Sequence, residues 1–511
     1  MSTKSEILQN PGNFINGEWL REGDPKQEIE SVNPGDLSDT IGRFPSHINH
    51  VELAVKSARQ AFARFKRTTL EERIELLQKY KSVIQARSEE MATLICREVG
   101  KPLWEARTEV KGMIGKVDLS IQAGMQLTQD VEIENILPGV KGAYRHRPLG
   151  VMSVIGPFNF PAHLPNGHIV PALLYGNTVV FKPSEKTPGV GLLMADFFRE
   201  AGFAPGVFNL VQGSRDISKA LVSHPQVHGV LFTGSYPVGK AIKQATIDQP
   251  WKILALEMGG INSAIVHEDA NLDQALAETI TGAFLTTGQR CSATSRILIH
   301  ESLYEEFSKE FVSKARQIEI GNPMEEVFMG PLIDCFSRQS FLGAMEQARE
   351  EGFEILLEAS ELNPGKDGFY VSPLICKGSA NLEKMLDSTF LQTEVFGPAV
   401  TLIPYSSLED AMTLANASDY GLVCSVFTAS ESVFQECWHE VETGLVNWNK
   451  STVGASSKLP FGGLKASGNF FPTAVTAGKY CSYPVTSMEG DVKAPGNWNY
   501  VGISSPERKE S

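Results

Sequence analysis

From Gly150 onwards the sequence alternates short β-rich runs with helical segments. The first four runs are GVMSVIGP (150–157), NTVVFKP (177–183), VFNLVQG (207–213) and VHGVLFTG (227–234). Each is rich in Val, Ile, Leu or Phe and ends at Gly or Pro. Strands that alternate with helices predict a parallel, doubly wound sheet of the α/β class. Such sheets bind ligands at the carboxyl ends of their strands, so the residues that end these runs are candidate site residues.

A second alternating set begins near Gly260. Its predicted strands are SAIVHE (263–268), SRILIH (295–300), FYVSPLIC (369–376), PAVTLIPY (398–405) and LVCSVFTA (422–429), and 302–318 is a predicted helix. The stretch before Gly150 is different, because 51–65 and 72–100 carry apolar residues at helical spacing. Two blocks of this size predict two α/β lobes, with a ligand cleft between them. We expect the lobes to comprise 1–128 with 150–258, and 259–469.

Two segments just outside the lobes are short and strand-like. They are KGAYRHRPLG (141–150) and GKYCSYPVTSM (478–488). We expect them to pair in a small protruding sheet built from 129–149 and 470–490, with 491–511 as a tail. An exposed sheet edge favours self-association.

Composition excludes several classes of function. The net charge is −14, and no Lys/Arg-rich run is present, which argues against nucleic acid or an anionic membrane as a partner. We find neither a signal peptide at the N-terminus nor an apolar stretch long enough to cross a bilayer. The 7 cysteines are scattered without a C-x-x-C pair, so neither a disulfide framework nor a metal site is predicted. These features are typical of a reducing, cytoplasmic setting.

Two strand ends could hold a nucleotide. In VLFTGSYPVGKAIKQ, Gly234 ends a strand, Ser235 can cap the helix that follows, and Gly239 lies in that helix; a helix N-terminus suits a phosphate. In NTVVFKPSEKTP, Lys182 and Glu185 follow a strand, where an acidic side chain can bind ribose hydroxyls. The alternatives are a tight βα turn at the first stretch and a solvated loop at the second.

Three further residues could carry chemistry. Asn159 follows a β-rich run, and its amide could donate to an oxyanion. Glu257 ends an apolar run, and burial would give it a raised pKa that suits a general base. Cys291 has Arg290 beside it, and a flanking cation lowers a thiol pKa, while the small residues after it leave room for a substrate at the sulfur. The alternatives are a turn residue, an ion-paired carboxylate and an inert buried cysteine.

The order of these stretches is more specific than any one of them. GPFNFP, FKPSE, FTGS, LEMGG, GQRC, EVFGP and PFGG occur in this order, and between Phe14 and Glu489 the chain resembles the aldehyde dehydrogenases. Within that family, NFPAHLPNGHIVPALLYGNTVVFKPSE, NWNKSTVGASSKLPFGG, ASGN and YCSYPVTSME resemble members that oxidise N-succinyl-L-glutamate 5-semialdehyde in arginine catabolism. The resemblance departs from the common pattern at GGINSAIV and around Ser292 and Thr294.

The resemblance implies a role for each candidate. Cys291 would be the nucleophile, Asn159 and the Cys291 N–H would hold the oxyanion, and Glu257 would activate water. NAD would be the cofactor, bound by Ile155, Gly156, Pro157, Phe158, Lys182, Ser184, Glu185, Gly213, Gly234, Ser235, Gly239 and Met258 of the first lobe and by Gly259, Glu394 and Phe396 of the second. The second lobe would be catalytic, and the small sheet would join a homodimer or a dimer of dimers.

An anionic substrate requires a cation near its path, and Lys116 and Arg290 are the candidates. Three alternatives remain. The substrate could be glutamate or succinate semialdehyde, the enzyme could transfer the acyl group to CoA, or the scaffold could be non-catalytic.

Overall fold

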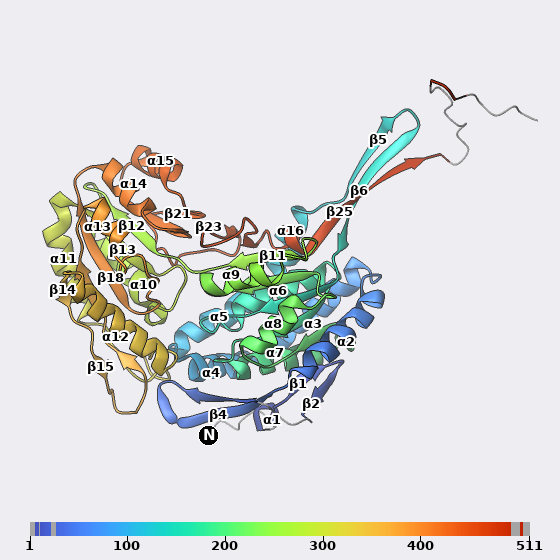
Figure 1. Cartoon of the computed structure of the whole chain (residues 1–511), viewed down its shortest axis with the longest axis horizontal. Helices are drawn as coiled ribbons and strands as arrows, with labels where there is room; N and C mark the ends of the chain where they lie inside the picture. Colours follow the sequence, from blue (N-terminus) through green and yellow to red (C-terminus); the bar gives the residue numbers. More distant parts are fainter. Residues whose placement is uncertain (1–5, 10, 22–26, 492–500, 504–511) are drawn as a thin grey trace, which may run out of the picture.

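Two α/β lobes lie side by side, and a narrow sheet projects from the first lobe (Figure 1). The computed structural model describes residues 6–9, 11–21, 27–491 and 501–503. Within these residues, no helix is long and apolar enough to cross a membrane. The predicted fold class, two doubly wound lobes with a small additional sheet, is confirmed.

The first lobe is built on a seven-stranded sheet in the order β11-β10-β7-β8-β9-β1-β2. The parallel strands are β7 (Val151–Ile155), β8 (Thr178–Lys182), β9 (Phe208–Leu210), β10 (Gly229–Thr233) and β11 (Ile253–Glu257), and β1 (Asn13–Ile15) and β2 (Glu18–Leu20) form an antiparallel edge. Its helices are α1 (Glu6–Gln9), α2 (Asn49–Phe65), α3 (Leu70–Ala86), α4 (Ser88–Val99), α5 (Leu103–Leu119) with the π-helical turn η1 (Ser120–Gly124), α6 (His163–Leu174), α7 (Pro188–Glu200), α8 (Arg215–Ser223) and α9 (Tyr236–Ala245). One helix follows each of β7, β8, β9 and β10, as the sequence pattern predicts.

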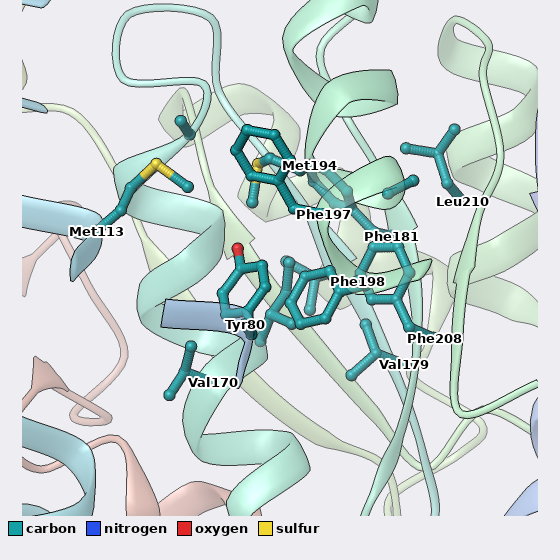
Figure 2. Packing of buried hydrophobic residues seen from close by; sticks show 14 of the residues in the cluster. Tyr80, Met113, Val170, Val179, Phe181, Met194, Phe197, Phe198, Phe208 and Leu210 are labelled. Atoms are coloured by element: carbon teal, nitrogen blue, oxygen red, sulfur yellow. The ribbon is translucent and has the colours of Figure 1, made fainter. Parts of the chain in front are cut away.

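Aromatic side chains fill the core between this sheet and its helices (Figure 2). The ring of Phe198 stacks between Tyr80 and Phe208, with centroid distances of 3.9 and 4.2 Å. The Tyr80 hydroxyl donates to Asn166 Oδ1 at 3.0 Å, so the one polar atom of this stack is satisfied. The packing fixes α3, α6 and α7 against the sheet.

The second lobe has its own seven-stranded sheet, in the order β14-β17-β18-β13-β12-β20-β21. Its strands are β12 (Asn262–Val266), β13 (Thr294–His300), β14 (Glu354–Leu357), β17 (Leu374–Lys377), β18 (Ala399–Tyr405), β20 (Val423–Phe427) and β21 (Leu445–Trp448), and only β14 is antiparallel. Its helices are α10 (Leu272–Phe284), the 3₁₀ turn η2 (Leu285–Gly288), α11 (Glu301–Ala315), α12 (Cys335–Glu350), α13 (Leu382–Asp387), α14 (Leu408–Asn416) and α15 (Glu431–Glu440).

The projecting arm is the three-stranded sheet β25-β6-β5. It is formed by β5 (Val131–Leu137), β6 (Val140–Pro148) and β25 (Ser482–Gly490), and β25 pairs with β6 along its whole length. The remaining two-stranded pairs are β3 (Gln27–Asn33) with β4 (Asp36–Ser46), β15 (Glu361–Leu362) with β16 (Tyr370–Val371), β19 (Tyr420–Gly421) with β23 (Leu464–Lys465), and β22 (Pro460–Phe461) with β24 (Thr473–Ala474).

Three predicted elements differ in detail. The helical run 72–100 breaks at Arg87, whose backbone leaves the helical region and whose side chain pairs with Glu90 and Asp196. The run 369–376 is divided at Pro373, which cannot donate a ladder hydrogen bond, and β16 pairs outside the main sheet. The start of 478–488 is the short helix α16 (Gly478–Cys481), buried against Tyr175.

Candidate active site

Cys291 lies in a loop that leads from the turn η2 into β13. Thr286 and Thr287 both have φ of +56°, and Gly288 has φ of +69°. A left-handed conformation costs about 1–2 kcal/mol for each residue with a Cβ. Gly288 avoids this cost because it has no Cβ. A Cβ at this position would also lie 2.2 Å from the carbonyl oxygen of Gly397. The loop before Cys291 is therefore strained and must be held by its contacts.

Asn159 reaches this loop from the first lobe. It follows β7, and its Nδ2 donates to the carbonyl oxygen of Gln289 at 2.9 Å. Its Oδ1 accepts from the N–H of Phe160 at 3.1 Å, which fixes which end of the amide faces the cysteine loop. An amide nitrogen carries two N–H donors, so a second donor remains for an oxyanion.

Glu257 ends β11 and is 4% exposed. Its Oε2 has no hydrogen-bond partner among the described residues. Burial raises the pKa of this carboxyl well above its ordinary value, and the N–H of Thr473 only partly opposes the shift. A buried carboxyl with one unpartnered oxygen and a raised pKa has the properties of a general base near neutral pH.

The thiol of Cys291 is surrounded by charges of both signs. Burial, together with the carboxylates of Glu394 and Glu257, raises its pKa to about 12 against the opposing charge of Arg290. At neutral pH the sulfur therefore carries its proton until a base removes it. On the other side of the residue, the Cys291 carbonyl oxygen accepts from Asn262 Nδ2 at 2.8 Å, which anchors the loop to β12.

The carboxyl ends of β7, β8, β10 and β11 lie along one edge of the first sheet. Ile155 is in register with Lys182 on one side and Phe232 on the other, and Thr233 with Glu257. Lys182 Nζ donates to the Gly213 carbonyl at 3.0 Å and to Glu185 Oε2 at 3.2 Å. Burial lowers the pKa of this ammonium, and Glu185 opposes the shift.

The other predicted cofactor residues surround this edge. Gly156 donates its N–H to the Lys182 carbonyl, Ser184 Oγ accepts from the N–H of Lys186, and Pro157 and Phe158 follow β7. Ser235 is the N-cap residue of α9, as predicted, although its side chain makes no capping hydrogen bond. Gly239 lies in α9 against Met258, which is 6% exposed.

Glu394 comes from the second lobe, and its carboxylate lies against Gly259 and Gly260, the two glycines that follow β11. Its Oε1 accepts from the N–H of Gly260 at 3.0 Å, and a Cβ on Gly259 would lie 2.0 Å from its Oε2. Burial raises the pKa of Glu394 to about 7. The ring of Phe396 meets Phe158 edge-on at 5.7 Å, so the two loops also touch through aromatic rings.

The two candidate cations differ in their surroundings. Arg290 NH2 donates to Glu105 at 2.7 Å, and its guanidinium lies over the ring of Phe160, so its charge is already paired. Lys116 lies on α5, is 3% exposed and forms no ion pair with any described residue. Burial lowers its pKa to about 7.

Two residues of the site were missed by sequence reasoning. Glu105 and Asn262 hold the cysteine loop, but neither lies in a motif with a chemical signature. Asn262 follows the glycines of LEMGG and could have been noted there, whereas Glu105 contacts residues 181 and 185 positions away. Within the described residues, no cluster of side chains suitable for a metal ion is present.

Comparison with known proteins agrees with this geometry. Residues 19–477 match the model of the aldehyde dehydrogenase family. The N-succinylglutamate 5-semialdehyde dehydrogenase of Hahella chejuensis is 38% identical over 94% of this chain and 96% of its own, and that of Paraburkholderia xenovorans is 39% identical over 93% and 96%. The solved 1-pyrroline-5-carboxylate dehydrogenase from Thermus with bound NAD aligns with a TM-score of 0.87 at 29% identity, covering 94% of this chain and 92% of that one. The chain therefore belongs to the aldehyde dehydrogenase family.

Proposed function

We propose that the protein oxidises N-succinyl-L-glutamate 5-semialdehyde to N-succinyl-L-glutamate with NAD, by a hydrolytic route through Cys291, as a step of arginine catabolism. The observation that carries this proposal is the meeting of Asn159, Glu257 and the cysteine loop at one place between the lobes. The substrate follows from the names of the two bacterial relatives.

The residues along the first sheet's edge fit NAD. α9 begins directly after Gly234 and Ser235. The free N–H groups at its N-terminus suit the pyrophosphate of NAD. Lys182 and Glu185 would hold the adenosine ribose, and Glu394, held over Gly259, the nicotinamide ribose. When bound, NAD supplies the hydride acceptor for the oxidation.

In the proposed reaction the Cys291 thiol gives up its proton to a base as its sulfur bonds to the aldehyde carbon and the C=O π bond opens; that proton is the one that ends on the oxygen. The carbonyl oxygen takes up the negative charge and then a proton, and the Asn159 amide and the Cys291 N–H stabilise it. Loss of a hydride from that carbon, and of the hydroxyl proton, leaves a thioester on Cys291. Glu257 then takes a proton from water as the water oxygen attacks the thioester, the S–C bond breaks, and the sulfur regains its proton.

Lys116 is the better candidate for binding a substrate carboxylate. It is a buried ammonium with no carboxylate in ion-pair distance among the described residues, whereas Arg290 is engaged by Glu105. A carboxylate beside Lys116 would restore its ordinary pKa and form a charge-assisted hydrogen bond. A substrate with carboxylates is therefore a chemical match for this residue.

We also propose the assembly and the division of the chain. Residues 1–128 and 150–258 would bind NAD, 259–469 would be catalytic, and 129–149 with 470–490 would join copies into a homodimer or a dimer of dimers in the cytoplasm. The arm supports this because it exposes several large apolar side chains, which are Ile133, Ile136, Leu137, Tyr483 and Met488.

A steady-state panel tests the function. We expect kcat/KM for N-succinylglutamate semialdehyde to exceed that for glutamate or succinate semialdehyde, and NAD to be preferred over NADP. Faster oxidation of simple aliphatic aldehydes would contradict the substrate. Product analysis with and without CoA tests the hydrolytic route, and an acyl-CoA product would contradict it.

A further inference from the structure

One helix, α5, contacts both halves of the candidate site. Its start is docked on the second lobe, because the N–H of Leu103 donates to the carbonyl of Pro323 at 2.8 Å and Trp104 Nε1 donates to that of Val327 at 2.9 Å. The rest of the helix packs within the first lobe, against α3, α4 and α6. Two of its acidic residues, Glu105 and Glu109, are four positions apart and so share one face.

Glu105 binds the cysteine loop. Its Oε1 accepts from Arg290 NH2 at 2.7 Å and also from the hydroxyl of Thr286. Arg290 Nε in turn donates to Thr286 Oγ1 at 2.7 Å, which closes a triangle of three side chains. Glu105 is 1% exposed, so water competes little for these contacts. Thr286 is the first of the three left-handed residues, which places the triangle at the strained part of the loop.

Glu109 binds the loop that carries Asn159. Its Oε1 accepts from the N–H groups of Ala162 and His163, both at 3.0 Å, and its Oε2 accepts from Lys101 Nζ at 2.7 Å. Lys101 and Glu109 are both fully buried at their side chains. A carboxylate at the start of α6 interacts favourably with the helix dipole. This contact therefore fixes the point where the preceding loop ends and α6 begins.

The contacts made by Glu105 and those made by Glu109 meet at Phe160, the residue after Asn159. Lys101 Nζ lies 3.7 Å from the centroid of its ring, and Arg290 Cζ lies 4.9 Å from the same centroid. Arg290, which pairs with Glu105, and Lys101, which pairs with Glu109, thus contact the same ring. The cysteine loop of one lobe and the asparagine loop of the other are set by carboxylates one helical turn apart.

We propose that Glu105 is a positioning residue, which holds Thr286 in its left-handed conformation and thereby places Cys291 opposite Asn159. The inference rests on the proposed roles of those two residues. Without the tether, the threonine backbone relaxes toward an unstrained conformation and the sulfur moves with it. A glycine at position 286 adopts the left-handed conformation without strain and makes the tether unnecessary.

The test compares Glu105→Gln, Glu105→Gln with Thr286→Gly, and the control Arg107→Gln. Arg107 lies on the same helix but pairs with Glu89 at the surface, where its side chain is 48% exposed. The readout is the single-turnover burst of NADH with the aldehyde that the wild type oxidises fastest. We expect Glu105→Gln to slow the burst about 100-fold, as a displacement of about 1 Å does, with KM for NAD unchanged. The added Thr286→Gly should restore at least about tenfold, and Arg107→Gln should stay within about twofold.

A burst in Glu105→Gln within about threefold of wild type, or a double variant no faster than Glu105→Gln, overturns the proposal. If Glu105→Gln does not fold, Thr286→Val replaces it, because it removes the hydroxyl and keeps the Glu105–Arg290 pair. In Thr286→Val, alkylation of Cys291 by iodoacetamide, followed by mass spectrometry, should slow at least about fivefold as the sulfur leaves Arg290. An unchanged alkylation rate overturns the proposal. This measurement needs neither aldehyde nor NAD, so it separates a failure of the positioning role from a failure of the proposed function.

Discussion

Replacing Gly259 by alanine tests how the second lobe contributes to cofactor binding. The added Cβ would lie 2.0 Å from Glu394 Oε2 and 2.4 Å from Oε1, so the carboxylate must move. Gly259 is not in the left-handed region, so alanine introduces no backbone strain. Movement of Glu394 removes the hydrogen bond from Gly260 and, in the proposed function, the contact with the nicotinamide ribose. A hydrogen bond to a charged group contributes about 1.5–3 kcal/mol, which corresponds to a Kd for NAD raised about 10- to 150-fold.

Isothermal titration calorimetry with NAD measures this effect, and Gly343→Ala is the matched control. Gly343 lies in α12 with nothing within 4 Å of an added Cβ, so NAD affinity should stay constant and the free energy of unfolding should rise by about 0.5–1 kcal/mol. Because burial raises the pKa of Glu394 to about 7, the carboxylate is largely protonated at lower pH and accepts hydrogen bonds poorly. The Kd of the wild type should therefore be larger at pH 6 than at pH 8, and Gly259→Ala should lose this difference. A folded Gly259→Ala protein with wild-type affinity would refute the reasoning.

Three other substitutions test the chemistry. Cys291→Ala should abolish NADH formation while the Kd for NAD stays within about twofold, and turnover near the wild-type rate would exclude the covalent mechanism. Glu257→Gln should give a burst of NADH and then a stall, because deacylation slows by about 10²–10⁴; stopped-flow traces without a stall would contradict a role in deacylation. Since burial raises the pKa of Glu257, steady-state kcat of the wild type should rise with pH through that raised pKa, as the carboxyl becomes a base. Lys116→Met should raise KM for the anionic semialdehyde about 10- to 150-fold and spare a neutral aldehyde of similar length; equal losses on both would remove Lys116 from the substrate site.

The central strands of both lobes were predictable because most of their side chains are buried on both faces, whereas the more exposed strands β14 and β21 were not predicted. β7, β8 and β10 are predominantly apolar runs with every residue buried, which is how a parallel strand is recognised in sequence. The parallel pairing in turn places Lys182 and Glu257 at one edge. Local pattern was therefore sufficient for the residues at the strand ends.

The backbone conformation of the loop before Cys291 was not predictable from the local sequence pattern. Threonine disfavours a left-handed backbone, so nothing in TTGQRC indicates the turn at Thr286 and Thr287. The turn depends on Glu105 and on the Thr287 hydroxyl, which donates to the Gly330 carbonyl at 2.9 Å. Glu105 and Gly330 are both far from the two threonines in the chain, and nothing in the residue types shows that they are partners. The same holds for the break at Arg87, which depends on Asp196 in α7.

The path of the chain through the first lobe also determines when that lobe can be completed during synthesis. Asn177, just before β8, donates to the carbonyl of Cys481 at 2.7 Å, and Tyr480 bonds to His168 on α6. β6 pairs with β5 as soon as both are made, but its other edge stays open until β25 has been made. At ribosomal rates, the roughly 230 residues between β11 and the end of β25 take on the order of 10–50 s to translate. The nascent first lobe therefore waits with an open strand edge and an unfilled core while the entire second lobe is produced, and this interval is when a chaperone or a neighbouring nascent chain can bind it.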